Sequence, residues 1–203
     1  MSDTLSISRK EQIIHTAAKM FKEKGYAATS MRDIATELGI EAASLYHHIK
    51  SKEEILDTIC FATADKLVAS IAEVNDIYFN AEEKLRLAIK NHVHIISENI
   101  NQSAVFLHEW RSLSEPQLTE FKTLRDAYEN ELKVILREGV DEDVFADVDQ
   151  KFATLIILST VNWINEWYNP KGKMNAAEIA TKLSDFIMGG LRKKLVTDLN
   201  YKP

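Results

Sequence analysis

The stretch that decides the fold is residues 30–49, SMRDIATELGIEAASLYHHI. Apolar residues recur at helical spacing on either side of a break: Ile34, Ala35 and Leu38, then Ile40, Leu45 and Ile49. Gly39 stands at the break, where a tight turn needs the positive φ that glycine adopts at little cost. This is the spacing of a helix-turn-helix, whose second helix enters the major groove of DNA. An ordinary helical hairpin has the same spacing, so both interpretations stand at this point.

Helix starts are marked along the chain by Ser, Asn or Asp followed three residues later by Glu, Gln or Asp, a pair that satisfies free backbone N–H groups reciprocally. We expect helices to begin at seven such pairs: Ser8–Glu11, Ser30–Asp33, Ser51–Glu54, Asn80–Glu83, Ser114–Gln117, Asp147–Gln150 and Asn175–Glu178. Gly25 is expected to end the first helix, and Gly139 the fifth. Because no alternating stretch is long enough for a strand, the sequence predicts an all-α fold of about nine helices.

The composition agrees with long helices and few turns. Glycine and proline together account for 9 of 203 residues, about 4%, whereas an average chain has roughly 12%. A β-sandwich or barrel needs many more turn residues. With 45% hydrophobic and 28% charged residues, the chain is typical of a soluble globular protein and not of a disordered one.

The charge is distributed unevenly. Residues 1–52 carry a net charge of +2, from eight Lys and Arg against six Asp and Glu. Because the whole chain has a net charge of −6, residues 53–203 carry −8. The asymmetry suggests a basic head over residues 1–52 and an acidic body over residues 53–203. No flexible stretch separates the two, so the boundary is expected near the helix that starts at Ser51.

Targeting signals are not apparent. The single cysteine, Cys60, excludes an internal disulfide and a CxxC site. No apolar run reaches the roughly 18 residues of a membrane span, and the N-terminal MSDTLSISRK lacks the apolar stretch of a secretory signal. We therefore expect a cytoplasmic protein that does not associate with membranes.

The head resembles a known family. The residues that carry the resemblance are Gly25–Tyr26, Thr29–Ala35, Leu38–Ile40 and Ser44–Glu54. Over about residues 9–56 they strongly resemble the head of TetR-family transcriptional regulators. The resemblance implies a homodimeric repressor with a three-helix head that binds double-stranded operator DNA. It also implies a helical body that binds an inducer and dimerises.

Contacts with DNA follow from this resemblance and from the chemistry of the residues. In the family, the position of Tyr46 contacts the DNA backbone, and hydroxyl, imidazole and ammonium groups are donors to phosphates or base edges. The expected contact residues are Thr29, Ser30, Arg32, Ala42, Ala43, Ser44, Tyr46, His47, His48, Lys50 and Lys52. Core packing of Tyr46, and exposure of both histidines without contacts, remain the alternatives. Since the second helix has no Lys or Arg before Lys50, few phosphate contacts are expected.

The last two helices are strongly apolar. Residues 152–167 are apolar on nearly all sides, which predicts a helix buried on most of its surface. The final helix adds Ile179, Leu183, Phe186, Ile187, Leu191 and Leu195. In the resembled family the last two helices of each subunit form a four-helix dimer bundle. The implied interface contains Phe152, Ile156, Leu183, Phe186, Ile187, Gly190 and Leu191; a purely intramolecular core is the alternative.

Two arginines point to an anion. Arg125 lies at helical spacing between Phe121 and Tyr128, which places it on the buried face, and Arg111 follows Trp110. A buried arginine needs an anionic partner. That partner is either an internal acid, with Glu109, Glu129 and Glu166 as candidates, or a ligand with an anionic head and an apolar tail.

The body is similar to a subgroup of the family. Glu109–Leu113, Leu124–Glu129 and Asn162–Tyr168 look like TetR-family regulators of fatty-acid and related CoA-dependent catabolism. The resemblance implies an acyl-CoA thioester as inducer and no other cofactor. Candidate ligand contacts are Phe106, Trp110, Arg111, Phe121, Arg125, Tyr128, Asn162, Trp163 and Trp167, with plain core packing as the alternative for the aromatic residues.

The sequence offers little support for an enzyme. It contains none of the motifs GxxxxGK, HExxH, GxSxG or GxGxxG. His92 and His94 are two residues apart on a helix, so they cannot share a metal ion. We therefore expect neither catalysis nor a metal site. Two alternatives remain: a TetR-type repressor of an efflux or stress operon that responds to a drug-like ligand, and a helical interaction protein that does not bind DNA.

Overall fold

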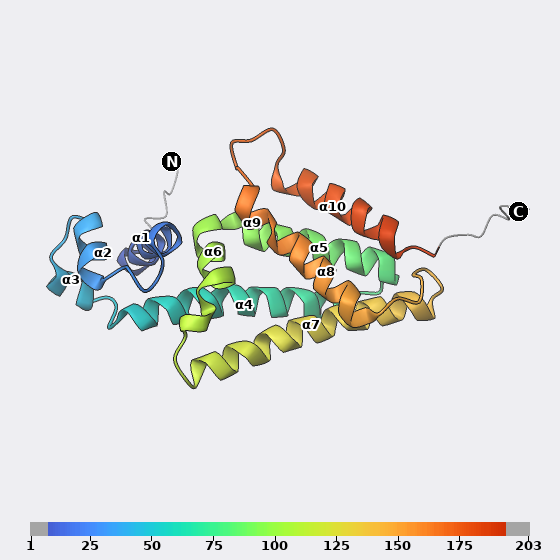
Figure 1. The fold of residues 1–203 in the computed structure, drawn as a ribbon, viewed down its shortest axis with the longest axis horizontal. Coiled ribbons are helices and arrows are strands. Elements are labelled where there is room, and N and C mark those ends of the chain that lie inside the picture. The colour runs from blue at the N-terminus through green and yellow to red at the C-terminus, as the bar shows by residue number, and fades with distance from the viewer. Residues whose placement is uncertain (1–7, 194–203) are drawn as a thin grey trace, which may run out of the picture. The chain divides into compact units, whose positions relative to one another are not determined.

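The structure, a computed structural model, describes residues 8–193, and its regular elements in this range are helices (Figure 1). Its elements are α1 (Arg9–Lys24), α2 (Met31–Glu37), α3 (Ala42–Tyr46), α4 (Lys52–Asp76), α5 (Ala81–Glu98), α6 (Ile100–His108), the 3-10 helix η1 (Trp110–Ser112), α7 (Gln117–Asp141), α8 (Gln150–Asn162), α9 (Ile164–Trp167) and α10 (Ala176–Leu191). Within the described residues, β-structure is limited to one isolated bridge between Phe145 and Arg192. The predicted all-α fold is confirmed. Leu195, expected in the last helix, lies outside the described residues.

Most of the predicted helix starts are confirmed. Ser8, Ser30 and Asn175 each form a complete capping box with the acid three residues later. Asn80 and Glu83 exchange the same two hydrogen bonds at the start of α5, and the Ser51 hydroxyl accepts the backbone N–H of Glu54. These caps depend only on residues within one turn of helix, which is why the sequence reveals them.

At two of the predicted starts the helix is present but the capping residue is a different one, and one helix was not predicted. At α7 the carboxylate of Glu115, not Ser114, accepts the N–H and hydroxyl of Thr119. At α8 the cap is Asp149 and not Asp147, since Asp149 accepts the N–H of Phe152. Asn99, which accepts the N–H of Gln102, begins the unpredicted helix α6. Asn99 and Gln102 have the spacing of the other pairs, so the signal was present in the sequence.

The predicted end of α7 at Gly139 is wrong, because the helix continues to Asp141. Gly139 is buried, and a Cβ built on it would overlap the ring of Phe145. Phe145 is 2% exposed, and its backbone N–H donates to the carbonyl of Gly139. Glycine is needed here for close packing of a ring against a helix, and not to terminate the helix.

The chain divides into two compact units, and both contain segments distant in sequence. The first unit comprises residues 8–68 with 95–126, and the second comprises residues 69–94 with 127–193. The head core of the first unit contains Ile13, Phe21, Ile34, Leu45 and Ile49, each at most 1% exposed. The predicted functional boundary at residue 52 stays a prediction.

The second unit has its own core, formed by Leu85, Ile89, Val93, Leu132, Ile135, Ile157 and Met188. Two ion pairs connect α5 with α10 and the residue that follows it. Arg86 Nη1 lies 2.8 Å from Asp185 Oδ1 on α10, and Arg192 Nη2, just after α10, lies 2.6 Å from Glu82 Oε1. None of the described helices is long and apolar enough to cross a membrane.

We predict opposite effects for two glycine-to-alanine substitutions. Gly139→Ala should lower the free energy of unfolding by about 1–3 kcal/mol, because the Phe145 ring must move to admit a methyl group. Gly189→Ala adds a methyl with no heavy atom within 4 Å and should raise it by about 0.5–1 kcal/mol. Urea unfolding at one protein concentration measures both. A Gly139→Ala protein as stable as wild type would contradict the packing described here.

Candidate DNA-binding head and ligand site

The head is a helix-turn-helix held by a small apolar core. Between α2 and α3 the chain turns at Gly39, whose φ of +64° confirms the predicted positive value. Ile34, Leu45 and Ile49 are all buried, and α3 packs against α2. The helix α3 has only five residues, too few to be stable without such anchoring. Its buried Leu45 therefore determines which side chains face outward.

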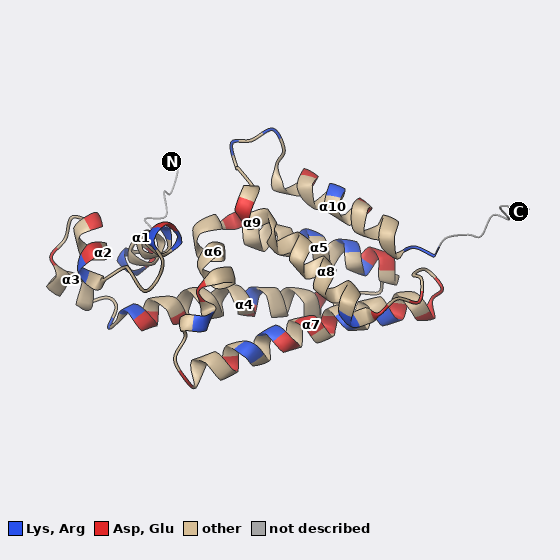
Figure 2. Cartoon of the chain, viewed as in Figure 1, with Lys and Arg blue, Asp and Glu red and all other residues tan. Residues whose placement is uncertain are grey.

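The outward face of α3 carries the predicted recognition residues. Tyr46 is 52% exposed, which rules out core packing as its role. Ala43, His47 and His48 are exposed, and Ala42 and Ser44 are half-buried. The helix itself carries no Lys or Arg (Figure 2). Glu41 precedes it without making a side-chain cap. The face offers hydroxyl, imidazole and methyl groups, and its cations come from the flanking segments.

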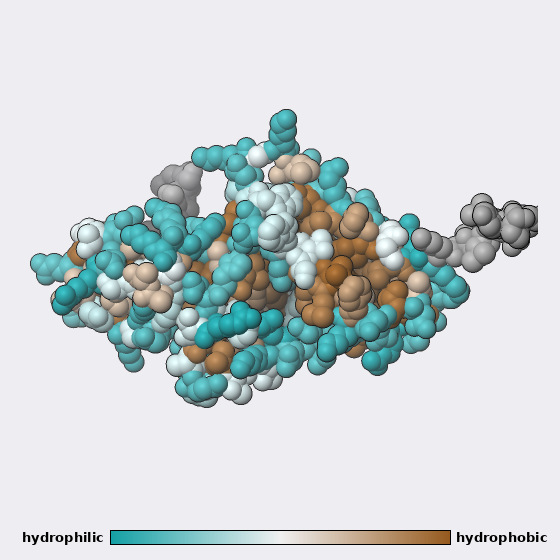
Figure 3. All heavy atoms as spheres, in the orientation of Figure 1, coloured by the Kyte–Doolittle hydropathy of each residue, from teal (hydrophilic) through white to brown (hydrophobic). Residues whose placement is uncertain are grey.

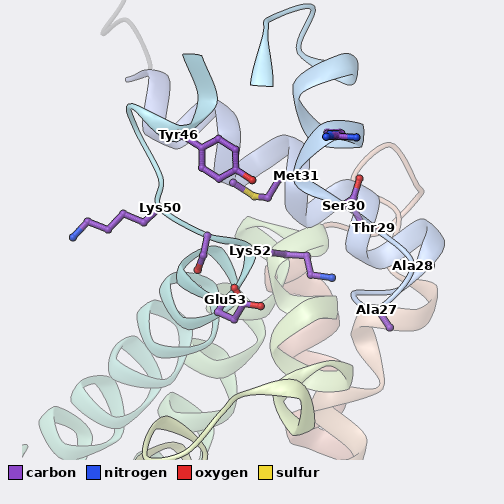
Figure 4. Close-up of a pocket in the computed structure, with 11 residues that line it drawn as sticks. Ala27, Ala28, Thr29, Ser30, Met31, Tyr46, Lys50, Lys52 and Glu53 are labelled. Atoms are coloured by element: carbon purple, nitrogen blue, oxygen red, sulfur yellow. The ribbon is translucent and has the colours of Figure 1, made fainter. Parts of the chain in front are cut away.

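Those cations line a pocket of about 500 Å³ on the head. Its walls are the start of α2, the end of α3 and the start of α4, with Ser30, Arg32, Tyr46, Lys50 and Lys52 among them. Figure 4 shows the Tyr46 ring beside Met31 and the Lys50 side chain extended away from the pocket. The hydroxyl groups and the cations of Arg32 and Lys52 on this concave surface, with Lys50 at its border, are suited to the phosphates of a nucleic-acid backbone.

Two predicted contact residues are engaged inside the head. Thr29 is 1% exposed, and its hydroxyl donates to the carbonyl of Gly25 at 2.9 Å. Its side chain therefore supports the loop, and the expected contact with phosphate is not kept. Lys52 Nζ donates to the carbonyl of Tyr26 at 2.9 Å and lies 4.3 Å from the centroid of its ring. Burial and the nearby Glu53, Asp57 and Glu109 raise the pKa of Tyr26 to about 12.

The predicted ligand contacts fall into two groups, one in each unit. In the first unit, aromatic rings gather around Phe121, which is fully buried. Phe106 lies edge-on to it at 5.6 Å between ring centroids, Phe61 edge-on at 6.1 Å, and Trp110 stacks at 5.8 Å. Phe61 was not predicted. These rings form an apolar wall with Trp110 at its half-exposed edge.

Both arginines of this group lie on Trp110. The guanidinium of Arg111 is 4.4 Å from the indole centroid and that of Arg125 is 4.6 Å. Arg125 is exposed, so its predicted position on the buried face is wrong: its head reaches solvent along the indole. Neither guanidinium has an ion-pair partner among the described residues. Glu109, one of the candidate internal acids, instead accepts the backbone N–H of Tyr26. Two cations on one aromatic ring form a site for an anion with a planar group.

In the second unit, Tyr128 and Asn162 meet at a buried histidine. Nδ1 of His92 lies 2.8 Å from the Tyr128 hydroxyl, and Nε2 lies 2.9 Å from Oδ1 of Asn162. Burial lowers the pKa of His92 to about 4, against an opposing contribution from Asn162, and it raises the pKa of Tyr128. We did not predict this role for His92, although its spacing from Ile89 and Ile96 places it on the apolar face of α5.

The two tryptophans of this group do not line an interior. Trp163 is 64% exposed and Trp167 is 44% exposed. They flank the short helix α9, because the predicted continuous helix breaks after Asn162. Core packing, the alternative for these aromatic residues, is therefore excluded for Trp163 and Trp167, and both stay candidate ligand contacts.

Apolar side chains are also exposed along α8 and α10 (Figure 3). Phe186 is 80% exposed, Phe152 65% and Ile156 49%, so the prediction that the penultimate helix is buried on most sides is wrong within one chain. These residues and Gly190 line a groove of about 220 Å³ between the two helices. Of the predicted interface, Ile187 and Leu191 are buried within the chain and Leu183 is half-buried.

The helix-turn-helix head, followed by a larger helical body, has the organisation of a transcriptional regulator. Family models agree: residues 13–59 match the bacterial regulatory proteins of the tetR family, and residues 79–191 match the tetracyclin repressor-like C-terminal domain. The chain belongs to the TetR family, and it is a DNA-binding transcriptional regulator.

Three relatives place it more closely. The HTH-type transcriptional repressor KstR2 of Mycobacterium tuberculosis H37Rv is 31% identical over 193 residues, which cover 92% of this chain and 94% of KstR2. The structure of that ketosteroid regulator superposes with a TM-score of 0.87 at 29% identity, over 92% of this chain and 96% of the other. The fatty acid metabolism regulator protein of Bacillus subtilis 168 is 23% identical, over 90% of this chain and 95% of its own.

The third relative is AibR. Its crystal structure in complex with isovaleryl coenzyme A and operator DNA matches with a TM-score of 0.76 and 25% identity, over 93% of this chain and all of that one. All three relatives match along head and body alike.

We predict that the buried His92 makes stability depend on pH. Its pKa is about 4 in the folded protein and about 6.5 in an unfolded chain. The unfolded chain binds more protons between these values, so the free energy of unfolding should fall by up to about 3 kcal/mol as pH drops from 6.5 to 4. In His92→Gln this dependence should be much weaker, whereas His47→Gln, a change at an exposed histidine of the head, should keep it. Equal pH dependence in wild type and His92→Gln would refute the assignment.

Proposed function

We propose that the protein is a homodimeric repressor that an acyl-CoA thioester releases from its operator. The observation that carries the ligand assignment is the pair of exposed guanidinium groups of Arg111 and Arg125 on the indole of Trp110. Coenzyme A carries phosphates that the two guanidinium groups can bind. Support also comes from the similarity to AibR, whose structure holds isovaleryl coenzyme A, and to a fatty acid metabolism regulator.

The acyl part of such a ligand needs an apolar surface next to the cations. Phe106 and Phe121 pack beside Trp110 but are buried, so an acyl chain must enter between these rings to use them. Tyr128 and Asn162, in the second unit, are kept as further candidate contacts. To bind a cationic drug, the site would need acidic side chains or an aromatic ring with a free face. The ring of Trp110 is already covered by the guanidinium groups of Arg111 and Arg125. The alternative of a drug-responsive efflux regulator is therefore disfavoured.

On the DNA side, the proposed contacts are the outward residues of the head. Ser44, Tyr46, His47 and His48 present donors, and Ala42 and Ala43 allow close approach to thymine methyl groups. Ser30, Arg32, Lys50 and Lys52 line or border the pocket and would hold phosphates. Because its target is DNA, we expect the protein to act in the cytoplasm.

The proposed dimer uses the apolar face of α8 and α10. Phe152, Ile156 and Phe186 are more exposed than soluble monomers usually allow for a contiguous group. A two-fold interface would pair α8 and α10 with those of a second copy as a four-helix bundle. Repression then requires two heads about 34 Å apart, the spacing of successive major grooves. A ligand that alters this separation lowers the affinity for the operator.

A titration of the protein onto the DNA upstream of its own gene tests the proposal. Tyr46→Ala should weaken binding by about ten- to hundredfold, as expected for the loss of a contact worth 1–3 kcal/mol, with the helical circular dichroism unchanged. Tyr78→Ala is the matched control, because Tyr78 is a fully exposed tyrosine outside the head. Equal losses in both variants would count against the assigned contact face.

The same titration with short- to long-chain acyl-CoAs tests the ligand. One chain-length class should release wild type, and Arg111→Ala and Arg125→Ala should each need about tenfold more ligand, the loss expected for one charge-assisted contact. Arg137→Ala, a change at an exposed arginine further along α7, should behave as wild type. DNA binding that no thioester alters would leave the repressor and remove the acyl-CoA assignment.

We predict that the dimer depends on the exposed phenylalanine of α10. Phe186→Glu places a charge in the apolar face and should convert the protein to a monomer in analytical ultracentrifugation at micromolar concentration. Phe79→Glu makes the same change at an exposed phenylalanine outside α8 and α10 and should leave the oligomeric state unchanged. A wild type that sediments as a monomer would overturn the proposed dimer.

A further inference from the structure

A single acidic side chain links the candidate anion site to the DNA-binding head. Glu109 ends α6 and directly precedes Trp110 and Arg111. Its Oε1 accepts the backbone N–H of Tyr26 at 3.1 Å, in the loop between α1 and α2. Gly25 adjoins the same carboxylate oxygen, which would lie 3.8 Å from a Cβ built there. Glu109 thus contacts the head, while the indole of its sequence neighbour Trp110 lies against both guanidinium groups.

Tyr26 is the central residue of the loop that Glu109 holds. Its carbonyl accepts both Lys52 Nζ at 2.9 Å and the N–H of Thr29 at 3.3 Å. Its ring lies beneath the Lys52 ammonium and contacts Phe21 edge-on at 5.0 Å. The residues that follow, Ala27 to Arg32, form one wall of the head pocket. The position of Tyr26 therefore sets both the wall and the Lys52 ammonium.

The helix α6 is fastened to the head at both ends. At its start, the Asn99 side-chain amide lies 3.0 Å from Nδ1 of His15 on α1. At its end, the backbone N–H of Tyr26 donates a hydrogen bond to the Glu109 carboxylate. The two ties differ in chemistry, since only the second involves a carboxylate. An electrostatic change near the end of α6 therefore acts on the tie to Tyr26.

We propose that Glu109 is the positioning residue that transmits occupancy of the anion site on Trp110, Arg111 and Arg125 to the DNA-binding head. The inference rests on the proposed function and specifies its regulation. A phosphate bound by Arg111, two residues after Glu109 in the sequence, adds negative charge at the same end of α6 as the Glu109 carboxylate, and like charges repel. Glu53 and Asp57 already place negative charge around Tyr26, so a further anion favours withdrawal of Glu109 from the Tyr26 N–H. The loop then loses its anchor, and the pocket loses its DNA-competent arrangement.

Thermodynamic linkage makes the proposal measurable. If the ligand weakens DNA binding by a given factor, DNA weakens ligand binding by the same factor. Glu109→Ala removes the link but leaves both guanidinium groups and the DNA-facing residues in place. Glu109→Gln removes the charge but keeps an oxygen that accepts the Tyr26 N–H. The two variants therefore separate the hydrogen bond from the charge.

The experiment measures the operator dissociation constant with and without a saturating acyl-CoA thioester, and the calorimetric affinity for that thioester without DNA. Glu109→Ala should bind the operator about three- to tenfold more weakly without ligand, and its further loss on adding ligand should be less than about threefold. Its thioester affinity should stay within about threefold of wild type. Glu109→Gln should bind the operator nearly as wild type but respond to ligand less. Glu120→Ala, a change at an exposed acid of the same unit, should match wild type throughout.

The outcomes distinguish this inference from the proposed function. A wild type that responds to a thioester, with Glu109→Ala responding by the same factor, would overturn the role of Glu109 and leave the function standing. A wild type unaffected by every thioester would overturn both. If Glu109→Ala loses its helical circular dichroism, the response of Glu109→Gln decides: a response equal to that of wild type would refute repulsion of the carboxylate as the cause.

Discussion

The structure depends on the burial of Leu45 beneath the five-residue helix α3. A helix of this length is unstable in water, because the cost of nucleation is not recovered by so few hydrogen bonds. Leu45 and Ile49, both nearly inaccessible to solvent, attach it to the core built around Ile34. The same attachment turns Tyr46 and the two histidines outward. The orientation of the side chains that face outward for DNA recognition therefore depends on the burial of Leu45, an apolar residue inside the head.

The loop before α2 extends this dependence beyond the head. Tyr26 is buried. Its backbone N–H donates to Glu109 and its carbonyl accepts from Lys52, two side chains from distant parts of the chain. A buried backbone group that loses its partner is costly, so the loop has a strong preference for one arrangement. The proposed withdrawal of Glu109 would give the loop the second arrangement that regulation at a distance requires.

The sequence predicted what is decided locally, and it failed where tertiary packing decides. Capping boxes at Ser8, Ser30 and Asn175 and the turn at Gly39 involve neighbouring residues, and they were found. Arg125 shares the apolar stripe of Phe121, yet its long side chain carries the charge to solvent across Trp110. Periodicity gives the face of a helix on which a residue lies, but not how far its side chain reaches.

The same limit applies to the apolar residues of α8 and α10. Phe152 and Phe186 have the pattern of core residues, and hydrophobicity alone does not say whether a neighbouring helix belongs to the same chain or to a second copy. The chain carries a net charge of −6, and two such chains repel one another weakly at a distance. Screening reduces this repulsion to short range at physiological salt. Burial of large side chains at contact is worth several times more, so an acidic body does not oppose assembly through an apolar face. Screening also limits the repulsion between the acidic body and DNA. A phosphate at the head is therefore subject mainly to the positive charges of Arg32, Lys50 and Lys52.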